Sequence, residues 1–262
     1  MTQQIQFAIN RISAAGLSFA AFAAMAQRLG VKAIEIRNDL DGVESADGTP
    51  ARAIAATASA HGLAVRSINA LQRFDHYDAT RATEASALVR YAVDCGAQSL
   101  VLCPTNSRQD GRGAQQRHDD LVHALRQLQP LLASSGLTGL IEPLGFEECA
   151  VRRKSQAAQA IQEVDGAAIF ALVHDTFHHH LAGEAVFFPE FTGLVHISGV
   201  EDAAPGTSQM RDGHRVLVGP ADRLGNIAQL RTLLELVTAA TPRSSPLRRT
   251  SRMPPISSSG CA

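Results

Sequence analysis

The sequence predicts an α/β protein with a (β/α)8 TIM-barrel fold, and two observations carry that prediction. First, one unit recurs: a helical stretch ends at a glycine and an apolar strand follows at once, at Gly30, Gly62, Gly96, Gly136 and Gly166. Glycine in that place is the left-handed residue that stops a helix. Second, the strands are continuous apolar runs, which is typical of parallel strands covered on both faces. Seven or eight such units in 262 residues favour a barrel over an open doubly wound sheet.

Seven strands are expected in order, near residues 5–9, 32–37, 64–69, 99–103, 138–142, 168–174 and 193–198. The helices between them carry start signals, with Ser18, Thr49 before Pro50, and Ser155 as candidate N-caps. Pro130 is expected to kink or shorten the helix around residues 121–132. No G-x-G-x-x-G pattern follows the first strand, which disfavours a dinucleotide-binding fold.

The repeat breaks down near the C-terminus. After the last expected helix, residues 226–236, an eighth strand should follow, but residues 241–262 contain four Pro, six Ser, four Arg and no acidic residue. Such a composition is typical of disorder. We therefore divide the chain into a barrel domain, residues 1–236, and an irregular tail, residues 237–262, in which strand eight and helix eight are lost or replaced. An open barrel would expose the edges of strands one and seven, a route to a homo-oligomer.

Composition excludes several classes of function. A formal net charge of −1 provides no overall field for nucleic acid or anionic lipid. No apolar run approaches the ~20 residues needed to span a bilayer, and the N-terminus has no signal-peptide pattern. The four cysteines form no regular spacing, which indicates reduced thiols and a cytoplasmic protein. The expected partner is a small molecule.

Three successive strands each end at a potential metal ligand. Glu142 follows the apolar run 138–141, Asp175 follows 169–173 and His174, and His196 follows 193–195. Because neighbouring strand ends of a parallel barrel converge on one opening, these three side chains could share one ion. Two carboxylates and an imidazole suit Mn²⁺, Mg²⁺, Co²⁺ or Zn²⁺. The alternative is three rim residues with local hydrogen bonds.

Other polar residues follow the same strands. His178, three residues after Asp175, could hydrogen-bond a substrate oxygen, or belong to a surface run of histidines. Arg215 lies beyond strand seven and could hold substrate oxygens, or be an ordinary solvated arginine. Glu35 and Arg37 alternate on strand two, so one of them should point into the barrel, where a structural ion pair is the alternative role.

The segments Ile141–Phe146, His174–His178 and Val195–Ser198 resemble the xylose-isomerase-like barrels, which include sugar isomerases and epimerases. Within that family the chain is most similar to the inosose (2-keto-myo-inositol) isomerases. The resemblance implies Glu142, Asp175 and His196 as metal ligands, with Glu142 also a catalytic base; His178 and Arg215 are expected to bind substrate because of their positions at the rim. It also implies a fourth ligand, a glutamate on strand eight, for which no residue after Glu235 is available.

The resemblance implies a divalent-metal-dependent isomerase of a cyclic polyol ketone, inosose, that works through an enediolate in inositol catabolism. The alternatives are a ketose epimerase, an inosose dehydratase, or a non-catalytic truncated barrel. A one-base slip would explain the missing glutamate: codons that encode residues 243–262 can, read one base earlier, encode SFEPFAPNVAHAADIVERLR. That string contains the strand, its Glu and a helix. A divergent terminus is the other explanation.

Overall fold

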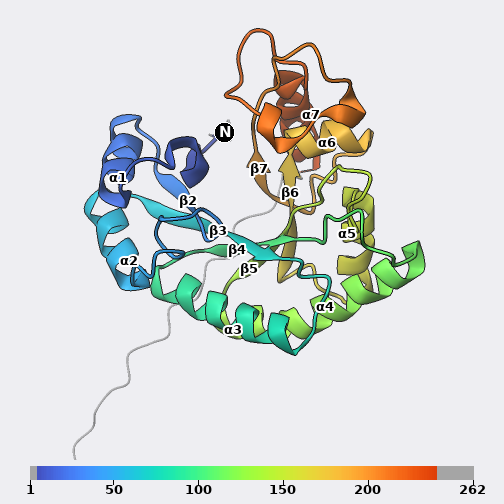
Figure 1. The fold of residues 1–262 in the computed structure, drawn as a ribbon, viewed down its shortest axis with the longest axis horizontal. Helices are drawn as coiled ribbons and strands as arrows, with labels where there is room; N and C mark the ends of the chain where they lie inside the picture. Colours follow the sequence, from blue (N-terminus) through green and yellow to red (C-terminus); the bar gives the residue numbers. More distant parts are fainter. Residues whose placement is uncertain (1–4, 241–262) are drawn as a thin grey trace, which may run out of the picture.

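The computed structural model describes residues 5–240, and its centre is a curled sheet of seven parallel strands. The strands are hydrogen-bonded in the order of the sequence, so each pairs with the one before it. Figure 1 shows the sheet with helices around its outer face. The strands are β1 (Ala8–Asn10), β2 (Ala33–Arg37), β3 (Ala64–Gln72), β4 (Ser99–Cys103), β5 (Thr138–Ile141), β6 (Phe170–Asp175) and β7 (Thr192–His196).

The described residues form seven α-helices and three short 3₁₀ helices; α7, η2 and η3 follow the last described strand. Helices α1 to α5 each separate two consecutive strands, and α6 begins directly where β6 ends. This strand–helix alternation confirms the predicted α/β architecture. The helices are α1 (Phe19–Arg28), α2 (Ala51–Ala60), α3 (Ala79–Asp94), α4 (Ala114–Ser135), α5 (Lys154–Glu163), α6 (Thr176–Ala182), α7 (Asn226–Ala240), η1 (Arg11–Ala14), η2 (Thr207–Gln209) and η3 (Asp212–His214).

The hydrophobic core has two layers. The larger layer fills the space between the helices and the outer face of the sheet, where Phe22, Leu125 and Phe170 are at most 2% exposed. A thin second layer lies on the inner face and contains Ala70, Val101, Cys103, Leu140 and Val173. Because the apolar layers cover both faces of the middle strands, these strands read as continuous apolar runs in the sequence.

Glycine ends four of the helices as predicted, with positive φ at Gly30, Gly62, Gly96 and Gly136. The fifth position differs: Asp165, with a φ of 50°, takes the left-handed conformation in place of Gly166. Pro130 does not shorten its helix, because α4 runs through it for 22 residues.

Helix starts agree with the sequence only in part. Ser18 caps α1 through its side chain as predicted. The N-cap of α2 is Pro50, not Thr49, and it makes no side-chain cap. Helix α5 begins one residue before Ser155, and the carboxylate of Glu184 accepts the first two backbone N–H groups of this helix at 3.0 Å each. Glu184, which is distant in sequence, therefore caps this helix in place of the local cap that the sequence predicted.

The sheet is open in the part of the chain that the structure describes, because β1 and β7 pair with one neighbour each. Helix α7 continues to Ala240, beyond the predicted end at residue 236. The predicted irregular tail lies, from residue 241 onward, outside the described residues, and so does the place where an eighth strand would follow. The result is a curled half-barrel with its rim open to one side (Figure 1).

Two expectations from composition can be compared with the described residues. No helix among residues 5–240 has the length and apolar character to cross a bilayer. Cys95, Cys103 and Cys149 are buried free thiols, and Cys261 lies outside the described residues.

Candidate metal centre and active site

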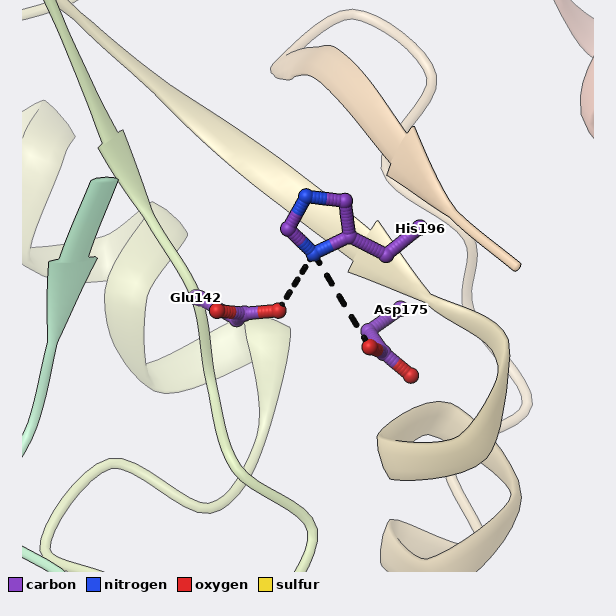
Figure 2. A group of neighbouring side chains, drawn as sticks. All are labelled: Glu142, Asp175 and His196. Carbon is purple, nitrogen blue, oxygen red and sulfur yellow. Dashed lines mark hydrogen bonds and ion pairs between the residues drawn. The ribbon is translucent and has the colours of Figure 1, made fainter. Parts of the chain in front are cut away.

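The three predicted ligands converge at one end of the sheet. Glu142 follows β5, Asp175 ends β6 and His196 ends β7, so parallel strands deliver all three to the same rim. Each offers one ligand atom, and these atoms lie within 4.8 Å of one another. Figure 2 shows both carboxylates directed toward one edge of the imidazole ring. Sequence reasoning therefore identified a cluster that exists in three dimensions.

The imidazole of His196 lies between two carboxylates. Its Nδ1 is 2.7 Å from Oε1 of Glu142, and its Nε2 is 3.1 Å from Oε2 of Glu35. Burial alone would lower the pKa of His196, but the charges of Glu35 and Glu142 raise it well above its usual value. Burial raises the pKa of Glu142, and the attraction of His196 outweighs it, so that this pKa is lowered.

Asp175 is held as an anion from two sides. Its Oδ1 accepts the backbone N–H groups of Phe177 at 2.8 Å and His178 at 3.2 Å, so this carboxylate caps α6. Its Oδ2 accepts Nη2 of Arg215 at 2.7 Å. Burial raises the pKa of Asp175, but Arg215 and the neighbouring histidines lower it well below its usual range. The residue thus keeps a charged oxygen directed at the cluster.

This donor set fits a divalent cation. Two buried carboxylates and an imidazole nitrogen within mutual reach are the ligand types that Zn²⁺ and Mn²⁺ take. The three ligands would leave coordination positions for substrate oxygens or water, as open catalytic sites do.

The two predicted substrate-binding residues are both at this rim. His178 is only 4% exposed and stacks edge-on against the rings of Phe146 and Phe177, so it is not part of a solvated surface run. Its Nδ1 has no hydrogen-bond partner among the described residues. Arg215 contacts Asp175, and its guanidinium lies 5.0 Å from the centre of the Phe177 ring. Arg215 therefore reaches the predicted metal ligand itself.

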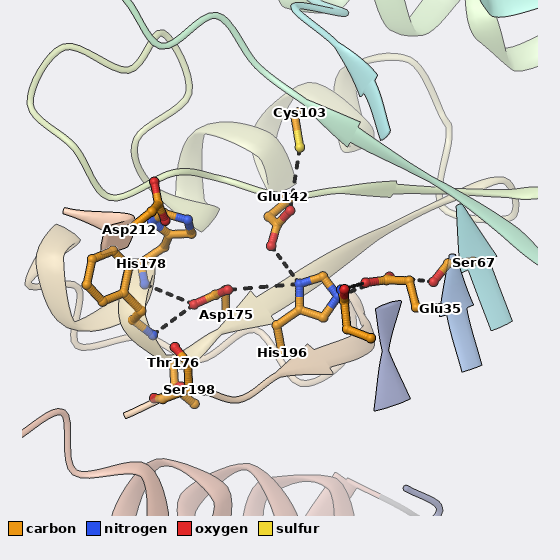
Figure 3. A network of polar contacts seen from close by, with 12 residues as sticks. Glu35, Ser67, Cys103, Glu142, Asp175, Thr176, His178, His196, Ser198 and Asp212 are labelled. Atoms are coloured by element: carbon orange, nitrogen blue, oxygen red, sulfur yellow. Dashed lines mark hydrogen bonds and ion pairs between the residues drawn. The ribbon is translucent and has the colours of Figure 1, made fainter. Parts of the chain in front are cut away.

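The structure adds residues that the sequence analysis did not assign to the site. Cys103, at the end of β4, donates its thiol to Oε2 of Glu142 at 3.5 Å. Burial keeps the pKa of this thiol well above its usual value, so it is protonated. Ser67 donates to Glu35 at 2.5 Å, and Figure 3 shows this chain from Ser67 through Glu35 to His196. Cys103 could have been predicted as a site residue, because it stands at a strand end as the three ligands do.

His174 alternates with Asp175 on β6 and makes its contacts away from the metal cluster. Its Nδ1 accepts from Lys154 and its Nε2 donates to Oε1 of Gln229, both at 2.9 Å. Burial, together with the charge of Lys154, lowers the pKa of His174 to about 4. Burial likewise lowers the pKa of Lys154 to about 8.

Comparisons with known proteins match both the sequence and the fold. The family described as xylose isomerase-like TIM barrel matches residues 23–233. A xylose isomerase domain containing protein from Salmonella typhimurium is 32% identical, with a TM-score of 0.82 over 90% of this chain and 86% of that one. No curated protein matches the sequence.

Two further solved structures share the fold at lower identity. The IOLI protein, whose structure holds a zinc atom, is 20% identical, with a TM-score of 0.77 over 89% of this chain and 85% of that one. A 3-keto-D-glucoside 4-epimerase from E. coli is 14% identical, with a TM-score of 0.57 over 82% of this chain and 94% of that one. Similarity at this level concerns the fold alone.

Proposed function

The chain belongs to the xylose isomerase-like TIM barrel family, and from that premise we propose that it is a divalent-metal-dependent isomerase of a cyclic polyol ketone, inosose, in inositol catabolism. The convergence of Glu142, Asp175 and His196 is the observation that carries the proposal. The zinc atom of the IOLI structure supports a metal in such a fold. The cation would be Mn²⁺, Mg²⁺, Co²⁺ or Zn²⁺. Buried free thiols support a reducing compartment, and we propose the cytoplasm.

Glu142, Arg215 and His178 each have a role in this reaction. A bound divalent cation supplies Lewis-acid polarisation of the substrate carbonyl, which acidifies the neighbouring C–H bond. Glu142 accepts that proton at a carboxylate oxygen, which leaves an enediolate. Return of a proton to the carbon that carried the ketone completes the isomerisation, and the family pattern assigns that step to a strand-eight glutamate. Arg215, held against Asp175, adds positive charge where the enediolate forms. His178, with an unpartnered Nδ1 among the described residues, hydrogen-bonds a substrate hydroxyl.

Proton exchange in D₂O tests the proposal directly. Inosose is incubated with the protein and each of the four cations, and the loss of the α C–H signal is followed by NMR while mass spectrometry follows the product. An isomer gains deuterium and keeps the water, whereas a dehydration product loses one water. An epimer keeps the ketone at its original carbon, so the carbon spectrum separates the three reactions.

Glu142→Gln keeps the shape of the side chain and removes the base, and its zinc content is measured in parallel because the same carboxylate is a proposed metal ligand. Exchange should fall at least ~100-fold, the usual contribution of a positioned general base. Glu147→Gln, on the same β5–α5 loop but exposed, should exchange at the rate of the unaltered protein. Exchange retained in Glu142→Gln, or absent from the unaltered protein with every cation, contradicts the proposal.

A further inference from the structure

The ring of His196 has two distinct edges with different partners. The carboxylates of Glu142 and Asp175 face Nδ1, at 2.7 Å and 3.9 Å. The carboxylate of Glu35 faces Nε2, at 3.1 Å. The two sides of one imidazole are therefore divided between the ligand cluster and a single residue from the opposite half of the sheet.

We propose that Glu35 is the positioning residue for His196: by accepting the Nε2 proton, it keeps the proton off Nδ1 when a cation is bound and aims Nδ1 at the metal site. Metal-binding histidines usually donate their second ring N–H to a carboxylate or carbonyl, which sets the tautomer and the ring orientation. This inference rests on the proposed metal site but not on the isomerase reaction.

Glu35 is itself firmly held. It is 3% exposed, its Oε2 accepts from Oγ of Ser67 at 2.5 Å, and its Oε1 accepts from the side-chain amide of Asn10. Asn10 and Ser67 are the register partners of Glu35 on the neighbouring strands β1 and β3. Three adjacent strands thus hold one carboxylate at one level, as a rigid support for a ring requires.

The same contact spans the open sheet. Glu35 lies on β2 and His196 on β7, 161 residues apart in sequence, and Figure 3 shows the hydrogen bond passing between the two halves. The described parts of β1 and β7 do not pair. The orientation of the third ligand is consequently set by the half of the barrel that carries no ligand.

A direct ligand role for Glu35 is disfavoured by the geometry. The group of residues whose ligand atoms all lie within 4.8 Å contains Glu142, Asp175 and His196, but not Glu35. An ion that bound Glu35 would lie on the Nε2 side of the ring, away from the other two carboxylates. Because Glu35 faces Nε2 and the ligand cluster faces Nδ1, Glu35 can position the ring without binding the same ion.

The test measures metal affinity and histidine tautomer in the full chain. The dissociation constant for Zn²⁺ is obtained by competition with a chromogenic chelator, and the bound stoichiometry is measured alongside. Long-range ¹⁵N–¹H NMR of the Zn²⁺-loaded protein then reports which nitrogen of His196 carries the proton. We expect one zinc per chain and an Nε2-protonated ring whose Nδ1 binds the metal.

Glu35→Gln should weaken Zn²⁺ binding about 10- to 100-fold, the effect of removing a second partner of a metal-bound histidine, with one zinc still bound. Glu44→Gln is the matched control, because Glu44 is equally buried at 3% but pairs with Arg11 away from the cluster. It should leave the zinc affinity unchanged. If Glu35→Gln does not fold, Ser67→Ala removes one donor to Glu35 and should weaken binding in the same direction.

The outcomes separate the two proposals. An unaltered protein that binds no cation overturns the metal site and this inference with it. An unaltered protein that binds zinc, while the folded variants at positions 35 and 67 bind it equally well, overturns only the role of Glu35. A zinc-bound Nε2 in the NMR spectrum does the same.

Discussion

Acid should destabilise this protein through His174, because that residue is buried as a neutral ring. Its side chain is 0% exposed, between the ammonium group of Lys154 and the amide of Gln229. Burial and Lys154 lower its pKa from 6.5 to about 4. The unfolded chain therefore binds a proton at this residue below pH 6.5, while the folded chain does so only near pH 4. Stability falls as the pH drops through that window.

The magnitude follows from the two pKa values. Between pH 7 and pH 5 the proton taken up at His174 by the unfolded state alone removes about 2 kcal/mol from the free energy of unfolding. That is a large share of the ~5–15 kcal/mol by which domains are stable. The loss is complete below about pH 4, where both states carry the proton.

Urea unfolding at pH 7 and pH 5, with EDTA present to exclude metal binding, measures the effect. His174→Gln removes the titrating ring, so its free energy of unfolding should fall by about 2 kcal/mol less than that of the unaltered protein. Val173→Ala is the packing control, because Val173 is a buried neighbour on β6 that does not titrate. It should lower the free energy of unfolding by the same amount at pH 7 and at pH 5. If His174→Gln has the same pH dependence as the unaltered protein, the buried neutral ring is the wrong explanation.

Three further predictions concern packing and the chain end. A Cβ at Gly145 would overlap the carbonyl oxygen of His178, so Gly145→Ala should cost about 1–3 kcal/mol and weaken zinc binding; unchanged melting temperature and affinity would contradict this. Leu125→Ala, at a fully buried position on α4, should cost about 2–5 kcal/mol in urea unfolding, and a loss under 1 kcal/mol would speak against a tightly packed outer layer. Replacing residues 243–262 with SFEPFAPNVAHAADIVERLR should strengthen zinc binding at least tenfold, because the string supplies the missing glutamate, and equal affinity would contradict a fourth ligand there. Sequencing codons 230–262 tests the slip itself.

The strands and the ligand cluster could be predicted because their signals are local. Continuous apolar runs, five of them introduced by a glycine, mark buried parallel strands, and the residue after each run must lie at the rim. Glu142, Asp175 and His196 are therefore placed by chain position alone. Helix starts were less predictable: Glu184 caps α5 from a distant loop, and no local pattern records that contact.

Contacts across the barrel could not be predicted either, because no local sequence pattern records them. The sequence indicated that Glu35 or Arg37 would point inward, since alternate residues of a strand face opposite sides. It did not show that Glu35 hydrogen-bonds His196, which is 161 residues away in sequence, or that Arg215 hydrogen-bonds Asp175. By itself the sequence determined which side chains stand at the rim, because strand period and helix termination act within a few residues. Only the tertiary structure decided which of them touch, because the curvature of the sheet sets the distance between its two halves.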